Sequence, residues 1–151
     1  MAVDPRKVVR RLYEEVWNQR KLETVSELIA PTHALNDPHL AGSAVGPEAY
    51  KGIVARFIAA FPDLRFSVED FITEKNKVVA CWTFSGTHKR EYRGVPPTNK
   101  KISFDGVTVN HVSNGKIIES FVTMDYFSLM QQLGVLPSSV EKSFRSAIPG
   151  D

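Results

Sequence analysis

Residues 102–125 of the 151-residue chain read ISFDGVTVNHVSNGKIIESFVTMD, and the predicted fold is built around this stretch. Residues 102–112 are rich in β-branched and aromatic side chains, which predicts a β-strand. The Ser-Asn-Gly sequence at 113–115 is typical of a tight hairpin turn, and residues 116–125 predict a returning strand. The stretch therefore predicts an antiparallel β-hairpin.

Two further strands precede this hairpin. Leu64, Phe66 and Val68 alternate with polar residues, a pattern typical of a half-buried strand. Residues 78–88 are nearly continuous in β-forming residues, which predicts a strand covered on both faces. A polar turn at 74–77 separates the two segments, so both are expected to run antiparallel to their neighbours.

The first sixty residues predict helices. Apolar residues recur there at steps of three and four, and proline residues end two of the segments. Asp4 is the expected N-cap of the first helix. The three expected helices cover residues 5–18, about 23–29 and 50–61. Residues 32–40 are expected to be irregular or a short strand, because the Asp37-Pro38 pair opposes a helix.

Helices followed by consecutive antiparallel strands predict an α+β fold. We expect a strongly curved antiparallel sheet with the three N-terminal helices packed over its concave face, and a pocket between the two layers. A last helical turn or two is expected near residues 127–133. In this interpretation residues 1–138 form a single domain and residues 139–151 form a C-terminal tail.

Composition narrows the classes of function. The single cysteine, Cys81, excludes an intrachain disulfide and a thiolate-cluster metal site. A net charge of +2 gives no basic surface for nucleic acid. The charged N-terminus does not resemble a signal peptide and no apolar run is long enough to span a membrane, so we expect a cytoplasmic protein. Nine phenylalanines, four tyrosines and two tryptophans are enough to line an apolar cavity.

Asp125 is the strongest candidate for chemistry. It follows Phe121 and Thr123 at strand period, so these three side chains are expected to share one face. A carboxylate among apolar residues must be hydrogen-bonded, paired or raised in pKa by desolvation, and a raised pKa suits proton transfer at neutral pH. The alternative is that Asp125 caps a helix beginning at Tyr126. Periodicity alone favours the cap.

Other polar residues are weaker candidates. His88 is in phase with Trp82 and Phe84, so its side chain is expected at the pocket end of that strand. Asp105 and His111 share a face of the next strand. Each of these residues has the simpler interpretation of a core or rim residue. The four histidines show no metal-ligand spacing, so no metal site is expected.

Short motifs follow one another along the chain in a distinctive order. They are Leu-Ile-Ala-Pro at 28–31, Asn-Asp-Pro at 36–38, Ala-Phe-Pro-Asp at 60–63, Gly-Thr-His at 86–88, Gly-Val-Pro-Pro-Thr at 94–98, Gly-Lys-Ile at 115–117, Asp125 and Gln-Leu-Gly at 132–134. Their order and spacing resemble the SnoaL-like polyketide cyclase (ester cyclase) family, within the nuclear-transport-factor-2-like superfamily. The resemblance implies a cone-shaped α+β barrel that is commonly a homodimer paired through its sheet.

The resemblance also implies a function. An aspartate in the position matched by Asp125 serves cyclases of this family as a general acid/base in an intramolecular aldol cyclisation, without a metal or organic cofactor. We therefore expect a cofactor-free cyclase or isomerase-type enzyme for a small hydrophobic carbonyl compound. Asp125 would act with Asn36, His88 and His111 as supporting donors. The expected cavity lining is aromatic: Trp17, Tyr50, Phe57, Trp82, Phe104 and Phe121.

The chain also departs from the family pattern. Asn36 stands where many relatives have histidine, Asn99 replaces a glycine, Phe121 replaces a tryptophan, and His111 stands where arginine is frequent. The superfamily includes proteins that bind a ligand without chemistry. A non-catalytic small-molecule-binding protein is therefore the alternative. A third possibility, a scaffold acting through its sheet surface, predicts a filled interior.

Overall fold

Helical segments form where apolar residues recur at helical spacing in the N-terminal third. The structure, a computed structural model that describes residues 3–145, begins with α1 (Pro5–Arg11), which continues as the π-helix η1 (Leu12–Asn18). As expected, the Asp4 side chain caps α1 by accepting from the backbone N–H of Arg6 at 3.0 Å. The remaining N-terminal helices are η2 (Leu22–Thr24), α2 (Val25–Leu28) and α3 (Gly46–Ala60).

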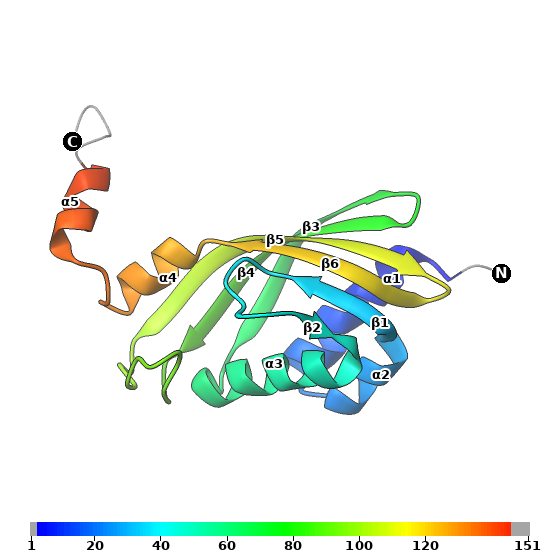
Figure 1. Cartoon of the computed structure of the whole chain (residues 1–151), viewed down its shortest axis with the longest axis horizontal. Helices are drawn as coiled ribbons and strands as arrows, with labels where there is room; N and C mark the ends of the chain where they lie inside the picture. The colour runs from blue at the N-terminus through cyan, green and yellow to red at the C-terminus, as the bar shows by residue number, and fades with distance from the viewer. Residues whose placement is uncertain (1–2, 146–151) are drawn as a thin grey trace.

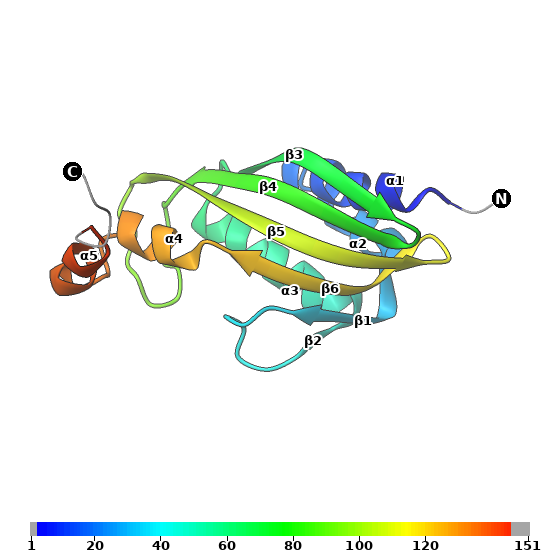
Figure 2. The ribbon, with the colours of Figure 1, turned by 90° about the horizontal axis from the view of Figure 1, so that it is seen from above.

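The strands form one six-stranded sheet. They are β1 (Ile29–Asn36), β2 (Ala44–Val45), β3 (Arg65–Glu74), β4 (Lys77–Thr87), β5 (Lys101–Ser113) and β6 (Lys116–Met124). Their order across the sheet is β2-β1-β6-β5-β4-β3. The long strands β3 to β6 lie side by side above the N-terminal helices (Figures 1 and 2). The predicted hairpin of residues 102–125 therefore provides the centre of the sheet.

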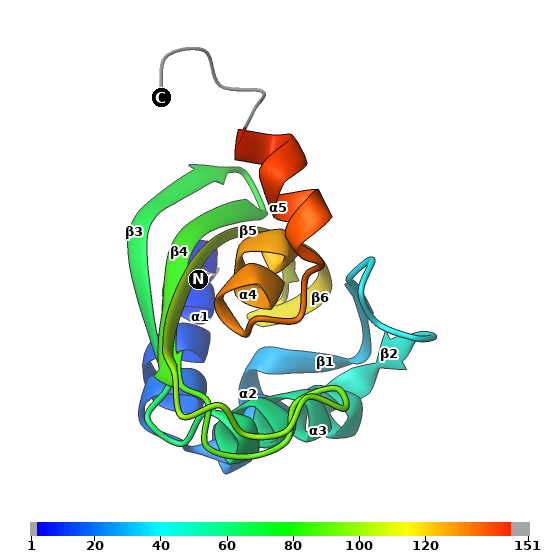
Figure 3. The ribbon, with the colours of Figure 1, turned by 90° about the vertical axis from the view of Figure 1, so that its left-hand side faces the viewer.

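The sheet differs from the expected one in the direction of one strand pair, in the additional edge strand β2 and in its closure. β1 runs parallel to β6, so the sheet is mixed rather than wholly antiparallel. This pairing joins segments far apart in sequence, and no local turn signals it. The sheet curves around the interior without closing, because β2 and β3 remain as edges (Figure 3).

The prediction that β4 is covered on both faces is wrong. Its burial alternates along the strand, as in a sheet with one covered face. Trp82 and Phe84 are buried on the concave side, whereas Cys81 and Thr83 between them are half-buried on the outer side.

Two helices follow the sheet at the end of the molecule opposite the start of α1 (Figure 1). They are α4 (Tyr126–Gln132) and α5 (Ser138–Arg145). The segment expected as a tail, residues 139–151, thus contributes residues 139–145 to α5, and residues 146–151 lie outside the described residues. The rings of Phe127 and Phe144 lie 4.7 Å apart and connect α4 to α5.

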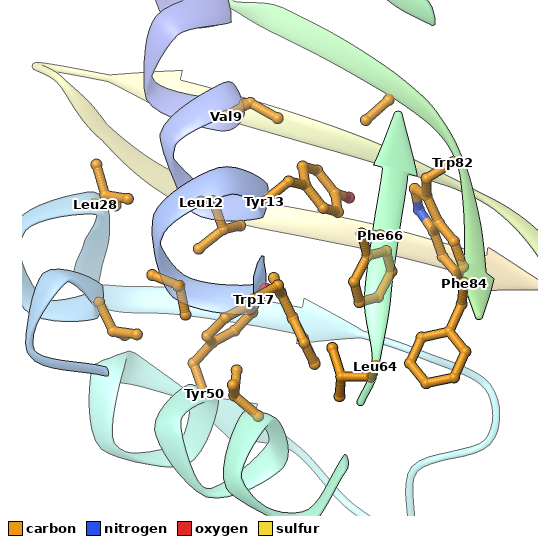
Figure 4. Packing of buried hydrophobic residues seen from close by; sticks show 14 of the residues in the cluster. Val9, Leu12, Tyr13, Trp17, Leu28, Tyr50, Leu64, Phe66, Trp82 and Phe84 are labelled. Carbon is orange, nitrogen blue, oxygen red and sulfur yellow. The ribbon is translucent and has the colours of Figure 1, made fainter. Parts of the chain in front are cut away.

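Aromatic side chains fill much of the space between helices and sheet. Phe66 lies at the centre, with ring centroids 4.8 Å from Trp17 and 4.9 Å from Trp82 (Figure 4). Tilted and edge-on geometries of this kind add stabilisation to the burial of apolar area. Among residues 3–145, no helix is long and apolar enough to cross a membrane.

Candidate active site

An inner cavity lies between the sheet and the N-terminal helices. Its volume is about 60 Å³, and most of its wall is apolar. The residues that line it are Leu12, Tyr13, Trp17, Leu35, Asp37, Tyr50, Ile53, Phe57, Phe66, Trp82, Phe84, Phe104, Thr108, Asn110, Ser120, Val122 and Met124. A cavity of this size holds a few atoms of a ligand but not an aromatic ring, which needs roughly 150 Å³.

A wider mouth adjoins the inner cavity. Its volume is about 540 Å³, and it shares Asp37, Ile53, Phe57 and Met124 with the inner cavity. The other residues that line it are His39, Leu40, Ala41, Arg56, Ala59, Glu91, Tyr92, Arg93 and Tyr126. The two spaces together can receive a ligand whose bulk lies in the mouth and whose end enters the inner cavity.

Three polar side chains on neighbouring strands interrupt the apolar wall. Thr108 and Asn110 point inward from β5, and Ser120 points inward from β6. The Ser120 hydroxyl donates to Oδ1 of Asn110 at 2.9 Å, and Nδ2 of Asn110 donates to the backbone carbonyl of Val78 at 3.3 Å. The Asn110 amide is therefore held from both sides.

A buried histidine completes this chain. Nε2 of His33 lies 3.0 Å from the Ser120 hydroxyl oxygen, and His33 is only 1% exposed. Because the single hydroxyl proton of Ser120 goes to Asn110, Nε2 of His33 must carry the proton and donate to Ser120. Burial lowers the pKa of His33 to about 4, so the ring is neutral at neutral pH.

Tyr50 lies beside the same group. Its hydroxyl oxygen accepts from Nε1 of Trp17 at 3.0 Å, and its ring packs edge-on against His33 at 5.8 Å. No described residue accepts the hydroxyl proton of Tyr50. Burial raises the pKa of Tyr50 above its ordinary value, so this proton is retained.

Asp37 is the one carboxylate among the described residues that line the inner cavity. It follows β1, and its Oδ1 accepts from the backbone N–H of His39 at 2.9 Å. Among the described residues, Oδ2 has no hydrogen-bond donor. The Asp37-Pro38 pair was expected to oppose a helix; Asp37 also accepts this local hydrogen bond and borders both spaces.

Five of the six aromatic residues predicted to line the cavity do so. They are Trp17, Tyr50, Phe57, Trp82 and Phe104. The sixth, Phe121, is 45% exposed and does not line the inner cavity. The reason is strand period: its neighbours Ser120 and Val122 point inward, so Phe121 points to the outer face.

Asp125 also lies on the outer side of the sheet. Its side chain is exposed, and its Oδ1 accepts from the backbone N–H of Ser128 at 3.0 Å as the N-cap of α4. It borders a shallow hollow with Thr83 and Asp105, and it does not line the inner cavity. Of the two roles considered for Asp125, the structure contains the helix cap. A catalytic role stays a prediction.

His88 and His111 do not line the inner cavity either. His88 is fully buried, but its Nδ1 accepts from the backbone N–H of Thr98 at 3.2 Å and its ring packs against Phe61. His88 therefore stabilises the loop between β4 and β5. His111 is on the outer face of β5, with Nδ1 3.6 Å from the Glu119 carboxylate.

Asn36 lies at the exposed end of β1, next to the inner cavity but outside its lining. Its Nδ2 donates to the backbone carbonyl of Ser120 at 3.3 Å, which helps to join β1 to β6.

The polar wall of Thr108, Asn110 and Ser120 was not predicted from the sequence. The signal was present, because Thr108 and Asn110 have the same strand phase as the inward-pointing Phe104. His33 carried no comparable signal, since its partner Ser120 is 87 residues away. Within residues 3–145, no group of three or more His, Cys, Asp or Glu side chains is arranged to hold a metal ion.

The fold and the site define a class: curved α+β cones with a largely apolar cavity beneath the sheet. A model of the SnoaL-like polyketide cyclase family matches residues 7–133. The chain belongs to this family. No curated protein matches the chain.

Solved structures of other proteins have the same fold. A proposed polyketide cyclase, IdmH of Streptomyces antibioticus, is 30% identical with a TM-score of 0.75, over 88% of this chain and 100% of that chain. A proposed SnoaL-like polyketide cyclase from Jannaschia sp. CCS1 has a TM-score of 0.79 at 24% identity, over 88% and 93%. A proposed polyketide cyclase from Acidithiobacillus ferrooxidans has a TM-score of 0.77 at 26% identity, over 89% and 98%.

Proposed function

We propose that the protein is a cofactor-independent acid/base enzyme that cyclises or isomerises a small hydrophobic carbonyl compound. The proposal rests on the inner cavity of this chain, which belongs to the SnoaL-like polyketide cyclase family. The cavity combines an aromatic wall, buried hydrogen-bond donors and one carboxylate at its opening. Enclosure of this kind strengthens electrostatic interactions with a developing charge.

In this proposal Asp37, rather than Asp125, moves the proton. The carboxylate of Asp37 removes a proton from the carbon next to a carbonyl group, and the electron pair of that C–H bond forms an enolate. The enolate carbon attacks a second carbonyl of the same molecule, and the resulting alkoxide takes the proton back from Asp37. Atoms and charge balance, so the overall change is an isomerisation. The free Oδ2 of Asp37 is the atom that suits this role.

Paired variants test the assignment. We expect the wild type to exchange the α-proton of an aromatic β-ketoester in deuterated water, as followed by NMR. Asp37→Asn should slow this exchange by about 10²–10⁴-fold, whereas Asp125→Asn should retain it while the fold is intact. Loss of exchange in Asp125→Asn alone would return the acid/base role to Asp125.

A non-catalytic binding protein is the second candidate. It is favoured by the single carboxylate in the described lining, because the other titratable side chains there, Tyr13 and Tyr50, have pKa values raised by burial and keep their protons. Tight binding of the β-ketoester by the wild type without any exchange would establish this alternative.

We also infer a homodimer formed through the outer face of the sheet. Val107, Ile118 and Phe121 are 38–45% exposed on β5 and β6. A second copy would cover these apolar side chains around a twofold axis.

A further inference from the structure

The inner end of the cavity contains donor protons without acceptors. Tyr50 receives a hydrogen bond from Trp17, so the oxygen is already used as an acceptor while its own proton has no described acceptor. Tyr50 is 7% exposed and lines the cavity. A buried hydroxyl with an unused proton is costly unless a ligand or water accepts it.

Asn110 supplies a second donor at the same end. Its amide nitrogen has two protons, and the structure uses one of them for the backbone carbonyl of Val78. Its oxygen is occupied by the Ser120 hydroxyl. Asn110 is 1% exposed and lines the inner cavity, and its remaining amide proton has no acceptor among the described residues.

The two donors belong to one connected group. His33 donates to Ser120, Ser120 donates to Asn110, and the His33 ring packs against Tyr50. The hydrogen bonds with Ser120 and Val78 fix which end of the Asn110 amide carries the oxygen and which carries the nitrogen. His33 and Ser120 therefore position the amide, and Tyr50 and Asn110 supply the donor protons that are left for a ligand.

We propose that Tyr50 and Asn110 form a subsite for one carbonyl oxygen of the ligand. The proposal deepens the proposed function, on which it rests: the carbonyl enters the 60 Å³ inner cavity, and the rest of the ligand lies in the mouth next to Asp37. Two buried donors that bind one oxygen would also stabilise the charge of an enolate better than that of the ketone. The ligand is thus a ketone or ester at the end of an apolar body.

A pair of isosteric probes tests the subsite. 2-Acetylnaphthalene carries the carbonyl, and 2-isopropenylnaphthalene replaces its oxygen by a CH₂ group of similar shape. Binding is measured by fluorescence of Trp17 and Trp82, which line the cavity. We expect the ketone to bind about 3–10-fold more tightly than the hydrocarbon, as suits a net gain of one or two hydrogen bonds.

Infrared spectroscopy measures the stretching frequency of the ligand carbonyl. A residue with a purely structural role would not change this frequency. The stretching band of the ¹³C-labelled carbonyl should lie lower in the wild-type complex than in hexane. Tyr50→Phe should shift the band back toward its hexane position, and Ser120→Ala should broaden it because the Asn110 amide can rotate. Ser103→Ala, on the exposed face of β5, is the matched control and should leave the band unchanged.

The outcomes separate the two proposals. A band at the hexane position in the wild type overturns the subsite even if a variant fails to fold, and so does an unchanged band in folded Tyr50→Phe. A lowered band without α-proton exchange supports the subsite and contradicts the enzyme. Exchange with a band that Tyr50→Phe does not move supports the enzyme and contradicts the subsite.

Discussion

Two buried histidines have different surroundings and different consequences. Nε2 of His33 donates to Ser120 in the cavity wall. Nδ1 of His88 accepts from Thr98, while its Nε2 has no described partner. Burial lowers the pKa of both rings, which favours their neutral forms in the folded protein. Of the two, only His33 is hydrogen-bonded to a residue that lines the inner cavity, Ser120.

The pH dependence of stability tests the state of His33. Its pKa is about 4 in the folded protein and about 6.5 in the unfolded chain, so the unfolded chain binds more protons between these values. The free energy of unfolding should therefore fall as the pH is lowered from about 6.5 to 4, by about 3 kcal/mol from His33. Urea titrations at several pH values measure it.

His33→Gln keeps a neutral polar side chain and should flatten this dependence. His88 contributes with the same sign, because its pKa is also lowered, and so some slope should persist in the variant. An identical slope in wild type and His33→Gln would contradict the buried, neutral histidine.

At the scale of elements, the packing of β4 against β5 depends on a glycine. Gly106 is opposite Trp82 in the register, and a Cβ atom placed on Gly106 would lie 2.3 Å from two carbons of the Trp82 ring. Nε1 of Trp82 donates to the Thr108 hydroxyl at 2.9 Å. The missing side chain thus lets the indole reach the cavity wall.

Gly106→Ala should displace Trp82. We expect a loss of about 1–3 kcal/mol in the free energy of unfolding, as for other overpacked sites, and a shifted tryptophan emission. Gly52→Ala is the control, because a Cβ there meets open space on α3, and it should stabilise by up to about 1 kcal/mol. Equal stability of wild type and Gly106→Ala would show that the indole does not fill this space.

Strand phase explains both what the sequence predicts and what it leaves open. Period two correctly groups Phe121 with Thr123 and Asp125, and the structure exposes all three. It does not tell which face is inside, because apolar side chains such as Val107 also occur on the outer face. The parallel pairing of β1 with β6 and the contact of His33 with Ser120 are non-local, so no pattern within either segment indicates them.

At the scale of the whole molecule, curvature divides the sheet into two different surfaces. The concave face and the helices enclose the inner cavity, whereas the outer face exposes Phe121 at 45%. β6 therefore contributes Ser120 to the cavity wall and the next residue, Phe121, to the outer surface.

The inferred homodimer is tested on that outer surface. The wild type should sediment as a dimer, and Phe121→Lys should shift it toward the monomer, because a charge would be buried without a partner. Val135→Lys alters an apolar residue of similar exposure, 43%, beyond α4 and should remain dimeric. A monomeric wild type would contradict the inference.

We propose that the inner cavity and its mouth bind the carbonyl compound. A crystal structure of the wild type with an aromatic β-ketoester tests it most directly. We predict a carbonyl oxygen within hydrogen-bond distance of Tyr50 and Asn110, with the adjacent carbon facing Asp37. A ligand bound in the outer hollow beside Asp125, with the inner cavity unchanged, would show that the inner cavity is not the binding site.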